Sequence, residues 1–118
     1  FKWAESNFAN KKTQESYDVI ICSDVIEHLL DPDLLLDYIE NMDFKYFIIS
    51  TPERDIVQKD QRGYLWDGPP NNPAHIREWN FEEFNKYISS RFNIIKHIMV
   101  KNNAEAYEMC QVVVGCKK

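Results

Sequence analysis

The sequence predicts one α/β domain, in which a mostly parallel sheet ends in an antiparallel C-terminal β-hairpin. Residues 17–23 and 45–51 are apolar runs rich in branched side chains, as are strands of a parallel sheet buried on both faces. A helical pattern separates these two runs, which gives a βαβ unit with parallel strands. Two more strand-like runs, 93–101 and 108–117, have too few residues between them for a crossover helix, so they should pair antiparallel.

Composition and charge fit one modest globular domain. The 118 residues are 44% hydrophobic and 28% charged. The net charge is −5 and no run of Lys or Arg stands out, so we expect no nucleic acid as a partner. No apolar run approaches the ~18 residues of a membrane helix, so we expect no membrane partner. The cysteines, Cys22, Cys110 and Cys116, form no C-x-x-C pair; we expect small buried side chains in a cytoplasmic protein and no metal.

The first helix is expected at about 31–42. Asp31 is a suitable N-cap and Pro32 fits the first helical position. Leu30, before the cap, can pack on Leu35 as a hydrophobic staple. The apolar residues at helical spacing are Leu34, Leu35, Tyr38, Ile39 and Met42.

The second helix is expected at about 80–91. Asn80 caps it, and Glu83 three positions later completes a pair like a capping box. Trp79 can pack on Phe84 as a staple. His97 lies inside the strand-like run that follows and is expected to be structural.

Residues 54–79 contain several Gly and Pro residues and show no sustained period. A loop this long within a small domain usually has a function. Its aromatic residues argue against disorder, since disordered segments are poor in aromatics. We expect this loop on the substrate side of the domain, and the charged stretch 53–62 as solvated surface.

Several segments resemble a known family. They are "YDVIICSDVIEHLLDPDLLL" (17–36), "FKYFIISTPE" (44–53) and "NPAHIREWNFEEF" (72–84). Together with the C-terminal pair of strands, they resemble the C-terminal half of a class I S-adenosylmethionine-dependent methyltransferase of the type 11/12 group. The resemblance implies a Rossmann-like sheet, S-adenosyl-L-methionine as cofactor, and methyl transfer to a hydroxyl or amine of a small-molecule acceptor.

One diagnostic part of the family is missing from the sequence. The family has a glycine-rich cofactor loop after its first strand, whereas the three glycines here, Gly63, Gly68 and Gly115, form no G-x-G pattern. We therefore expect residues 1–118 to be part of a methyltransferase domain that is inactive alone and that could self-associate through an exposed sheet edge. The alternative is a non-catalytic methyltransferase-like binding module. A piece of a nicotinamide-binding domain is disfavoured by the C-terminal hairpin.

The resemblance also implies which residues contact the cofactor. Asn7 and Phe8 stand where the family binds the adenine, although an exposed N-terminal tail is the plainer reading. Cys22, Ser23 and Asp24 end the first strand, where open α/β sheets bind ligands, and in the family this turn borders the methionine portion of the cofactor. Simple turn chemistry is the alternative for Ser23 and Asp24.

Catalytic and substrate-binding candidates follow in the same way. His28 is the catalytic candidate, because a histidine near the transferred methyl could accept the acceptor's proton; local packing is its alternative. Glu27, His75, Arg77 and Trp79 are the substrate-binding candidates. For Glu27 the alternative is a side chain that faces water. For Arg77 and Trp79 it is a packed pair that pins the loop onto the sheet.

Overall fold

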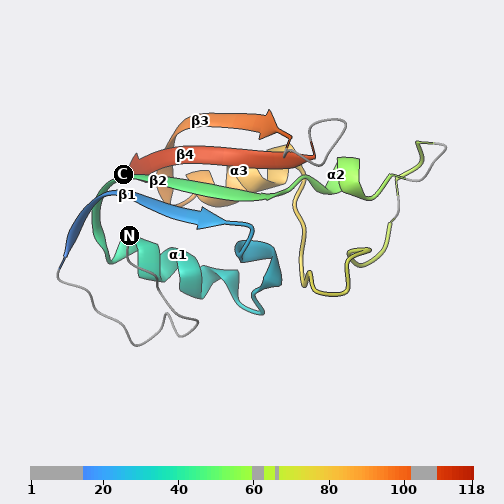
Figure 1. The fold of residues 1–118 in the computed structure, drawn as a ribbon, viewed down its shortest axis with the longest axis horizontal. Coiled ribbons are helices and arrows are strands. Elements are labelled where there is room, and N and C mark those ends of the chain that lie inside the picture. The colour runs from blue at the N-terminus through green and yellow to red at the C-terminus, as the bar shows by residue number, and fades with distance from the viewer. Residues whose placement is uncertain (1–14, 60–62, 66, 102–108) are drawn as a thin grey trace.

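The computed structural model describes residues 15–59, 63–65, 67–101 and 109–118. The elements are β1 (Ser16–Ser23), the 3-10 turn η2 (Ile26–His28), α1 (Pro32–Glu40), β2 (Asp43–Pro52), α2 (Arg54–Val57), α3 (Phe81–Ser89), β3 (Phe92–Val100) and β4 (Cys110–Lys117) (Figure 1). None of the helices in this described part combines the length and apolar character that a membrane span requires.

The strands form one sheet in the order β1-β2-β4-β3. β1 and β2 pair in parallel, and β4 pairs antiparallel with both β2 and β3. The predicted βαβ unit and the antiparallel C-terminal strands are therefore confirmed. In the parallel pair Ser23 lies opposite Ser50, so β1 and β2 end at the same edge of the sheet. We call this the carboxyl edge.

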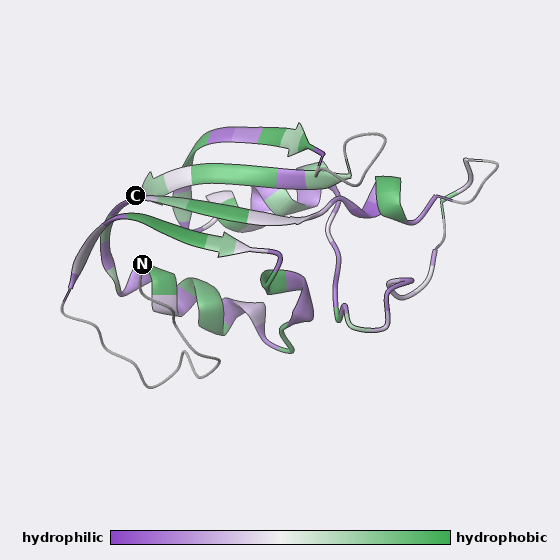
Figure 2. Cartoon of the chain, viewed as in Figure 1, coloured by the Kyte–Doolittle hydropathy of each residue, from purple (hydrophilic) through white to green (hydrophobic). Residues whose placement is uncertain are grey.

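The hydrophobic core lies on one face of the sheet. Side chains alternate along β2, so that Phe47 and Ile49 are fully buried on this face. α1 contributes Leu36 and α3 contributes Phe84 to the same cluster. In Figure 2, β1 and β4 are mostly hydrophobic and α1 carries hydrophobic bands. The buried apolar side chains therefore lie on the face of the sheet that α1 and α3 cover.

The opposite face of the sheet is more open than the sequence predicted. Val19 is 43% exposed, Ile21 61% and Tyr46 49%. Burial of the first strand on both faces is therefore wrong for the described residues. The physical reason is that no described helix packs on this second face (Figure 1).

The predicted helix caps are confirmed, and one of the two staples is not. The Asp31 side chain accepts a hydrogen bond from the Asp33 amide at 3.1 Å, and Asn80 and Glu83 form a complete capping box. The Trp79 and Phe84 rings lie 5.6 Å apart, as a staple requires. Leu30, however, is 86% exposed, and Leu29 is the residue that packs against the core after η2.

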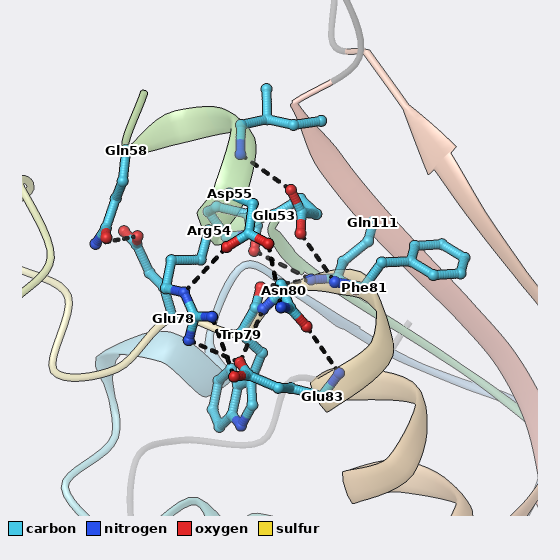
Figure 3. A network of polar contacts seen from close by, with 12 residues as sticks. Glu53, Arg54, Asp55, Gln58, Glu78, Trp79, Asn80, Phe81, Glu83 and Gln111 are labelled. Atoms are coloured by element: carbon cyan, nitrogen blue, oxygen red, sulfur yellow. Dashed lines mark hydrogen bonds and ion pairs between the residues drawn. The ribbon is translucent and has the colours of Figure 1, made fainter. Parts of the chain in front are cut away.

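The segment that follows β2 carries buried polar groups, although the sequence predicted solvated surface there. Glu53 is 4% exposed and accepts hydrogen bonds from the amides of Ile56 and Phe81 at 3.0 and 2.9 Å. One carboxylate thus caps both α2 and α3, because the first amides of a helix need acceptors (Figure 3).

The two ends of the 54–79 segment meet. Glu53 and Trp79 form an isolated β-bridge, and the Arg54 amide donates to the Trp79 carbonyl at 3.0 Å. The Arg54 guanidinium forks onto the Glu83 carboxylate at 2.7 and 3.0 Å. We call these contacts the neck of the segment.

Candidate functional site

Polar side chains gather at the carboxyl edge, where the sequence predicted cofactor contacts. The Ser23 and Ser50 hydroxyl oxygens lie 2.9 Å apart, and both hydroxyls contact the Asp24 carboxylate. The Asp24 amide donates to the Ser50 carbonyl at 3.1 Å. Asp24 has a φ of 52°, a left-handed conformation that costs a non-glycine residue ~1–2 kcal/mol. Strain of this kind clusters at functional sites.

Cys22 lies one residue earlier but faces the core. It is 9% exposed, and burial together with the nearby Glu27 and Asp24 carboxylates raises the pKa of its thiol to about 12. The thiol therefore stays protonated at neutral pH. Its surroundings match the buried hydrophobe that the composition indicated.

Glu27 is buried rather than turned toward water. It lies in η2, is 1% exposed, and accepts a hydrogen bond from the Thr51 hydroxyl at 3.1 Å. Burial raises the pKa of its carboxyl, since a charge in a poorly solvated place is costly. A cation beside this carboxylate would offset that cost.

His28 and His75 complete a compact group with Glu27. The two imidazole rings meet edge to face with centroids 4.7 Å apart. One potential ligand atom from each of the three residues lies within 4.8 Å of the others. Two imidazoles and one carboxylate at this spacing match the donor set of a zinc, manganese or iron site.

Hydrogen bonds place a proton on the Nδ1 atom of each ring. The His28 Nδ1 lies 2.7 Å from the Ala74 carbonyl oxygen, which can only accept, so Nδ1 carries the proton. The His75 Nδ1 lies 2.6 Å from the Glu78 carboxylate, with the same consequence. In the neutral form of each ring, Nε2 then carries the lone pair. The His28 Nε2 lies 3.8 Å from the Glu27 carboxylate, and the His75 Nε2 lies 3.3 Å from the Asn72 side-chain amide.

Backbone contacts bring these distant residues together. The amides of Ile76 and Arg77 both donate to the Glu27 carbonyl, at 2.8 and 3.3 Å. The 54–79 segment thereby returns onto η2 and places His75 beside His28. A cavity of about 220 Å³ adjoins the group; it is lined by Pro52, Val57, Asn71, Asn72, His75 and Glu78.

The remaining predicted residues lie elsewhere. Trp79 is 6% exposed and stacks on Tyr87, with ring centroids 5.5 Å apart. The Arg77 guanidinium lies 6.0 Å from the Trp79 ring centroid. This is the packed pair that the sequence analysis gave as the alternative to substrate binding. Asn7 and Phe8 lie outside the described residues.

Sequence reasoning named Glu27, His28 and His75 as separate candidates, but it did not bring them together as one potential metal-binding group, and it missed Thr51 and Glu78. Glu27 and His75 are 48 positions apart in the sequence (75 − 27), so no local spacing shows the group. Thr51 and Glu78 have no recognisable pattern either, although "HIRE" places a carboxylate three residues after His75. Only the return of the chain onto η2 makes them neighbours.

Several solved methyltransferase structures share this fold. The small RNA methyltransferase HEN1 superposes with a TM-score of 0.69 and 19% identity, over 97% of this chain and 15% of HEN1. A chain of the Pnkp1/Rnl/Hen1 RNA repair complex superposes with a TM-score of 0.60 and 21% identity, over 90% of this chain and 23% of that chain. N-methyltransferase NodS from Bradyrhizobium japonicum WM9 superposes with a TM-score of 0.63 and 13% identity, over 98% of this chain and 58% of NodS. No protein-family model matches the sequence, and neither does any curated protein.

The described residues therefore have part of the Rossmann-like fold of class I S-adenosylmethionine-dependent methyltransferases. The resemblance seen in the sequence is confirmed at the level of the fold. This chain spans less than two thirds of each of these three proteins.

The same comparisons contradict the prediction that nucleic acid is not a partner. The fold occurs in an RNA methyltransferase and in an RNA repair complex. The prediction rested on a net charge of −5, which is a sum over the whole chain. Such a sum does not describe the charge at one site, where a bound cation can reverse the local sign.

Proposed function

We propose that these residues form part of a methyltransferase that transfers a methyl group from S-adenosylmethionine to a hydroxyl of RNA. We further propose that a divalent cation binds at Glu27, His28 and His75. The observation that carries the proposal is the Glu-His-His group beside the carboxyl edge, where open α/β sheets bind their ligands. The likeness to the RNA-acting proteins supports the choice of acceptor.

The chain's own residues divide the work between the cofactor and the acceptor. Ser23 and Asp24 would border the methionine portion of the cofactor, whose sulfonium supplies the methyl group. Asp24 is held there by the Ser23 and Ser50 hydroxyls. Catalysis is then mainly a matter of placing the hydroxyl in line with the methyl group.

The metal ligands would place the acceptor. A divalent cation bound there would lower the pKa of a coordinated hydroxyl and orient it. Glu27 supplies the negative charge, and the two Nε2 atoms supply neutral lone pairs. This use of the His28 Nε2 competes with a role as the base that accepts the proton, and metal dependence separates the two roles.

RNA is favoured over a small-molecule amine because a ribose offers hydroxyls, which a divalent cation binds well. The 2′-hydroxyl is also what distinguishes RNA from DNA. An acidic chain can approach RNA at this place if the cation compensates the charge of Glu27. A non-catalytic binding module remains the second candidate, because the sequence lacks a glycine-rich loop.

The test uses the full-length protein that contains these residues. After chelation, it is incubated with methyl-labelled S-adenosylmethionine and an RNA oligonucleotide, with and without Mn²⁺. We expect labelled RNA only with the metal, no labelling of DNA of the same sequence, and a loss of about 100-fold or more in His75→Ala. Ser90→Ala, on the exposed end of α3, is the matched control and should keep wild-type activity.

Three results would contradict this proposal. If RNA is labelled equally in the presence of chelator, no metal is needed, and His28 is then the base that accepts the proton. If a small-molecule amine is labelled and RNA is not, the acceptor is that amine and the proposal of an RNA acceptor is wrong. RNA and metal binding without any methyl transfer would favour the binding module.

A further inference from the structure

A buried carboxylate, that of Glu78, contacts the Nδ1 of His75. Glu78 follows His75 by three residues, and its side chain is 3% exposed. Its Oε1 lies 2.6 Å from the His75 Nδ1. The short distance is typical of a hydrogen bond to a charged acceptor.

Gln58 holds the other oxygen of this carboxylate. The Gln58 amide donates to the Glu78 Oε2 at 3.2 Å, and Gln58 is 2% exposed (Figure 3). Both Glu78 oxygens are therefore occupied by protein donors. Among the ion pairs of the described residues, the partner of Glu78 is His75 and no Lys or Arg.

The two histidines of the group are supported differently. His28 donates its Nδ1 proton to a backbone carbonyl, that of Ala74, which is neutral and lies on an exposed turn. His75 donates to a buried carboxylate that is itself fixed. The other nitrogen of the ring, Nε2, contacts the side-chain amide of Asn72, an exposed residue that a ligand can displace.

We propose that Glu78 is a positioning residue for His75, and that Gln58 orients Glu78. The proposal rests on the metal site of the proposed function. Glu78 fixes the His75 tautomer with the proton on Nδ1, points Nε2 into the group, and makes the imidazole a stronger donor to a cation. Metal-ligating histidines commonly have such a carboxylate behind them.

The test measures metal binding directly. Co²⁺ is titrated into the full-length protein, and the visible absorbance of the bound ion reports both affinity and ligand geometry. Glu78→Gln keeps the size and one acceptor oxygen but removes the charge, so we expect Co²⁺ binding about 10- to 100-fold weaker with a changed spectrum. Glu78→Asp keeps the charge but not the reach, and should be impaired as well.

Glu53→Gln is the matched control. Glu53 is also a buried carboxylate of this network, but it accepts from the Ile56 and Phe81 amides and does not contact a histidine (Figure 3). The change should lower the melting temperature while leaving Co²⁺ affinity and spectrum unchanged. A merely structural role of Glu78 predicts the same behaviour for both glutamine variants.

The outcomes separate the two proposals. If wild type and His75→Ala bind Co²⁺ equally, the metal site of the proposed function is wrong. If His75→Ala loses binding while folded Glu78→Gln keeps it, the metal site stands and the positioning role is overturned. The role is also overturned if Glu53→Gln weakens binding as much as Glu78→Gln does. A Glu78→Gln chain that does not fold counts as support only if Glu78→Asp folds and binds Co²⁺ more weakly.

Discussion

Gly115 lies where β4 passes close to the aromatic core. A Cβ atom there would lie 2.5 Å from the Phe47 ring and 2.6 Å from the Asn93 carbonyl oxygen. Phe47 is fully buried and packs edge to face on Phe92, with ring centroids 4.9 Å apart. A side chain at this position would meet a packed ring and a backbone carbonyl, so the position requires glycine.

Gly115→Ala should therefore lower the free energy of unfolding by about 3 kcal/mol, near the upper end for overpacking a core. Urea denaturation followed by circular dichroism measures the loss. Gly63→Ala is the comparison, because Gly63 has a φ of 84° and open space around it. That change should cost only the backbone strain, ~1–2 kcal/mol. Equal losses in the two variants would show that the contact at Gly115 is not tight.

At the scale of elements, His97 connects β3 to both β4 and α3. Its Nε2 lies 3.0 Å from the Gln111 side-chain oxygen, and its Nδ1 lies 3.1 Å from the Asn85 amide. The ring stacks on Phe81 with centroids 3.6 Å apart. Burial lowers the pKa of His97, with the Gln111 hydrogen bond acting in the opposite direction. The neutral ring is the form that fits this place.

The depressed pKa makes His97 a source of acid sensitivity. The unfolded chain binds the proton more readily than the folded one, so stability is complete above the unfolded pKa of about 6.5 and falls as the pH drops below it. His97→Gln removes this contribution. We expect the difference in unfolding free energy between wild type and His97→Gln to shrink from pH 7.5 to pH 5.5. The other histidines are common to both chains, so a constant difference would contradict the prediction.

Elements with local signals could be predicted from the sequence. Asp31 and the Asn80–Glu83 pair mark helix starts because a cap needs only its own first turn. The Leu30 staple failed because packing depends on the direction of the chain after η2, which is not a local property. α2 and the burial of Glu53 were missed for the same reason, since Glu53 bonds to Phe81 far along the chain.

The sequence predicted individual candidate residues but not how they group in space. Ser23, Asp24 and His28 follow a strand, and the carboxyl end of a strand is a place where function is expected. The neighbourhood of His75 and Glu78 depends on two backbone hydrogen bonds to the Glu27 carbonyl. Neither residue type nor spacing in the sequence predicts such a contact.

At the scale of the whole molecule, the cofactor site is the part that this chain alone should not complete. In the proposed function, Ser23 and Asp24 at the carboxyl edge would border the methionine portion, but the sequence has no glycine-rich loop for the adenosine. Each missing hydrogen bond removes ~0.5–1.5 kcal/mol. Three such losses weaken a micromolar site by roughly 10- to 2,000-fold, to between about 10 μM and 1 mM or more.

Calorimetric titration of the 118-residue chain with S-adenosylmethionine tests this expectation. We predict no measurable heat of binding at micromolar concentrations and no methyl transfer by this chain alone. The full-length protein used for the RNA assay is the positive control. A micromolar dissociation constant for the 118 residues would show that the cofactor site lies elsewhere in them.

The neck of the 54–79 segment has a consequence for how such proteins can diversify. Its two ends are joined by the Glu53–Trp79 bridge and the Arg54–Glu83 pair, independently of what lies between them. The entropy of closing a loop grows only with the logarithm of its length, ~0.6 kcal/mol for each doubling. Insertions around the exposed Gly68 would therefore change how far the segment reaches beyond the carboxyl edge at little cost to the sheet (Figure 1). Segments of different length can therefore be carried on the same neck.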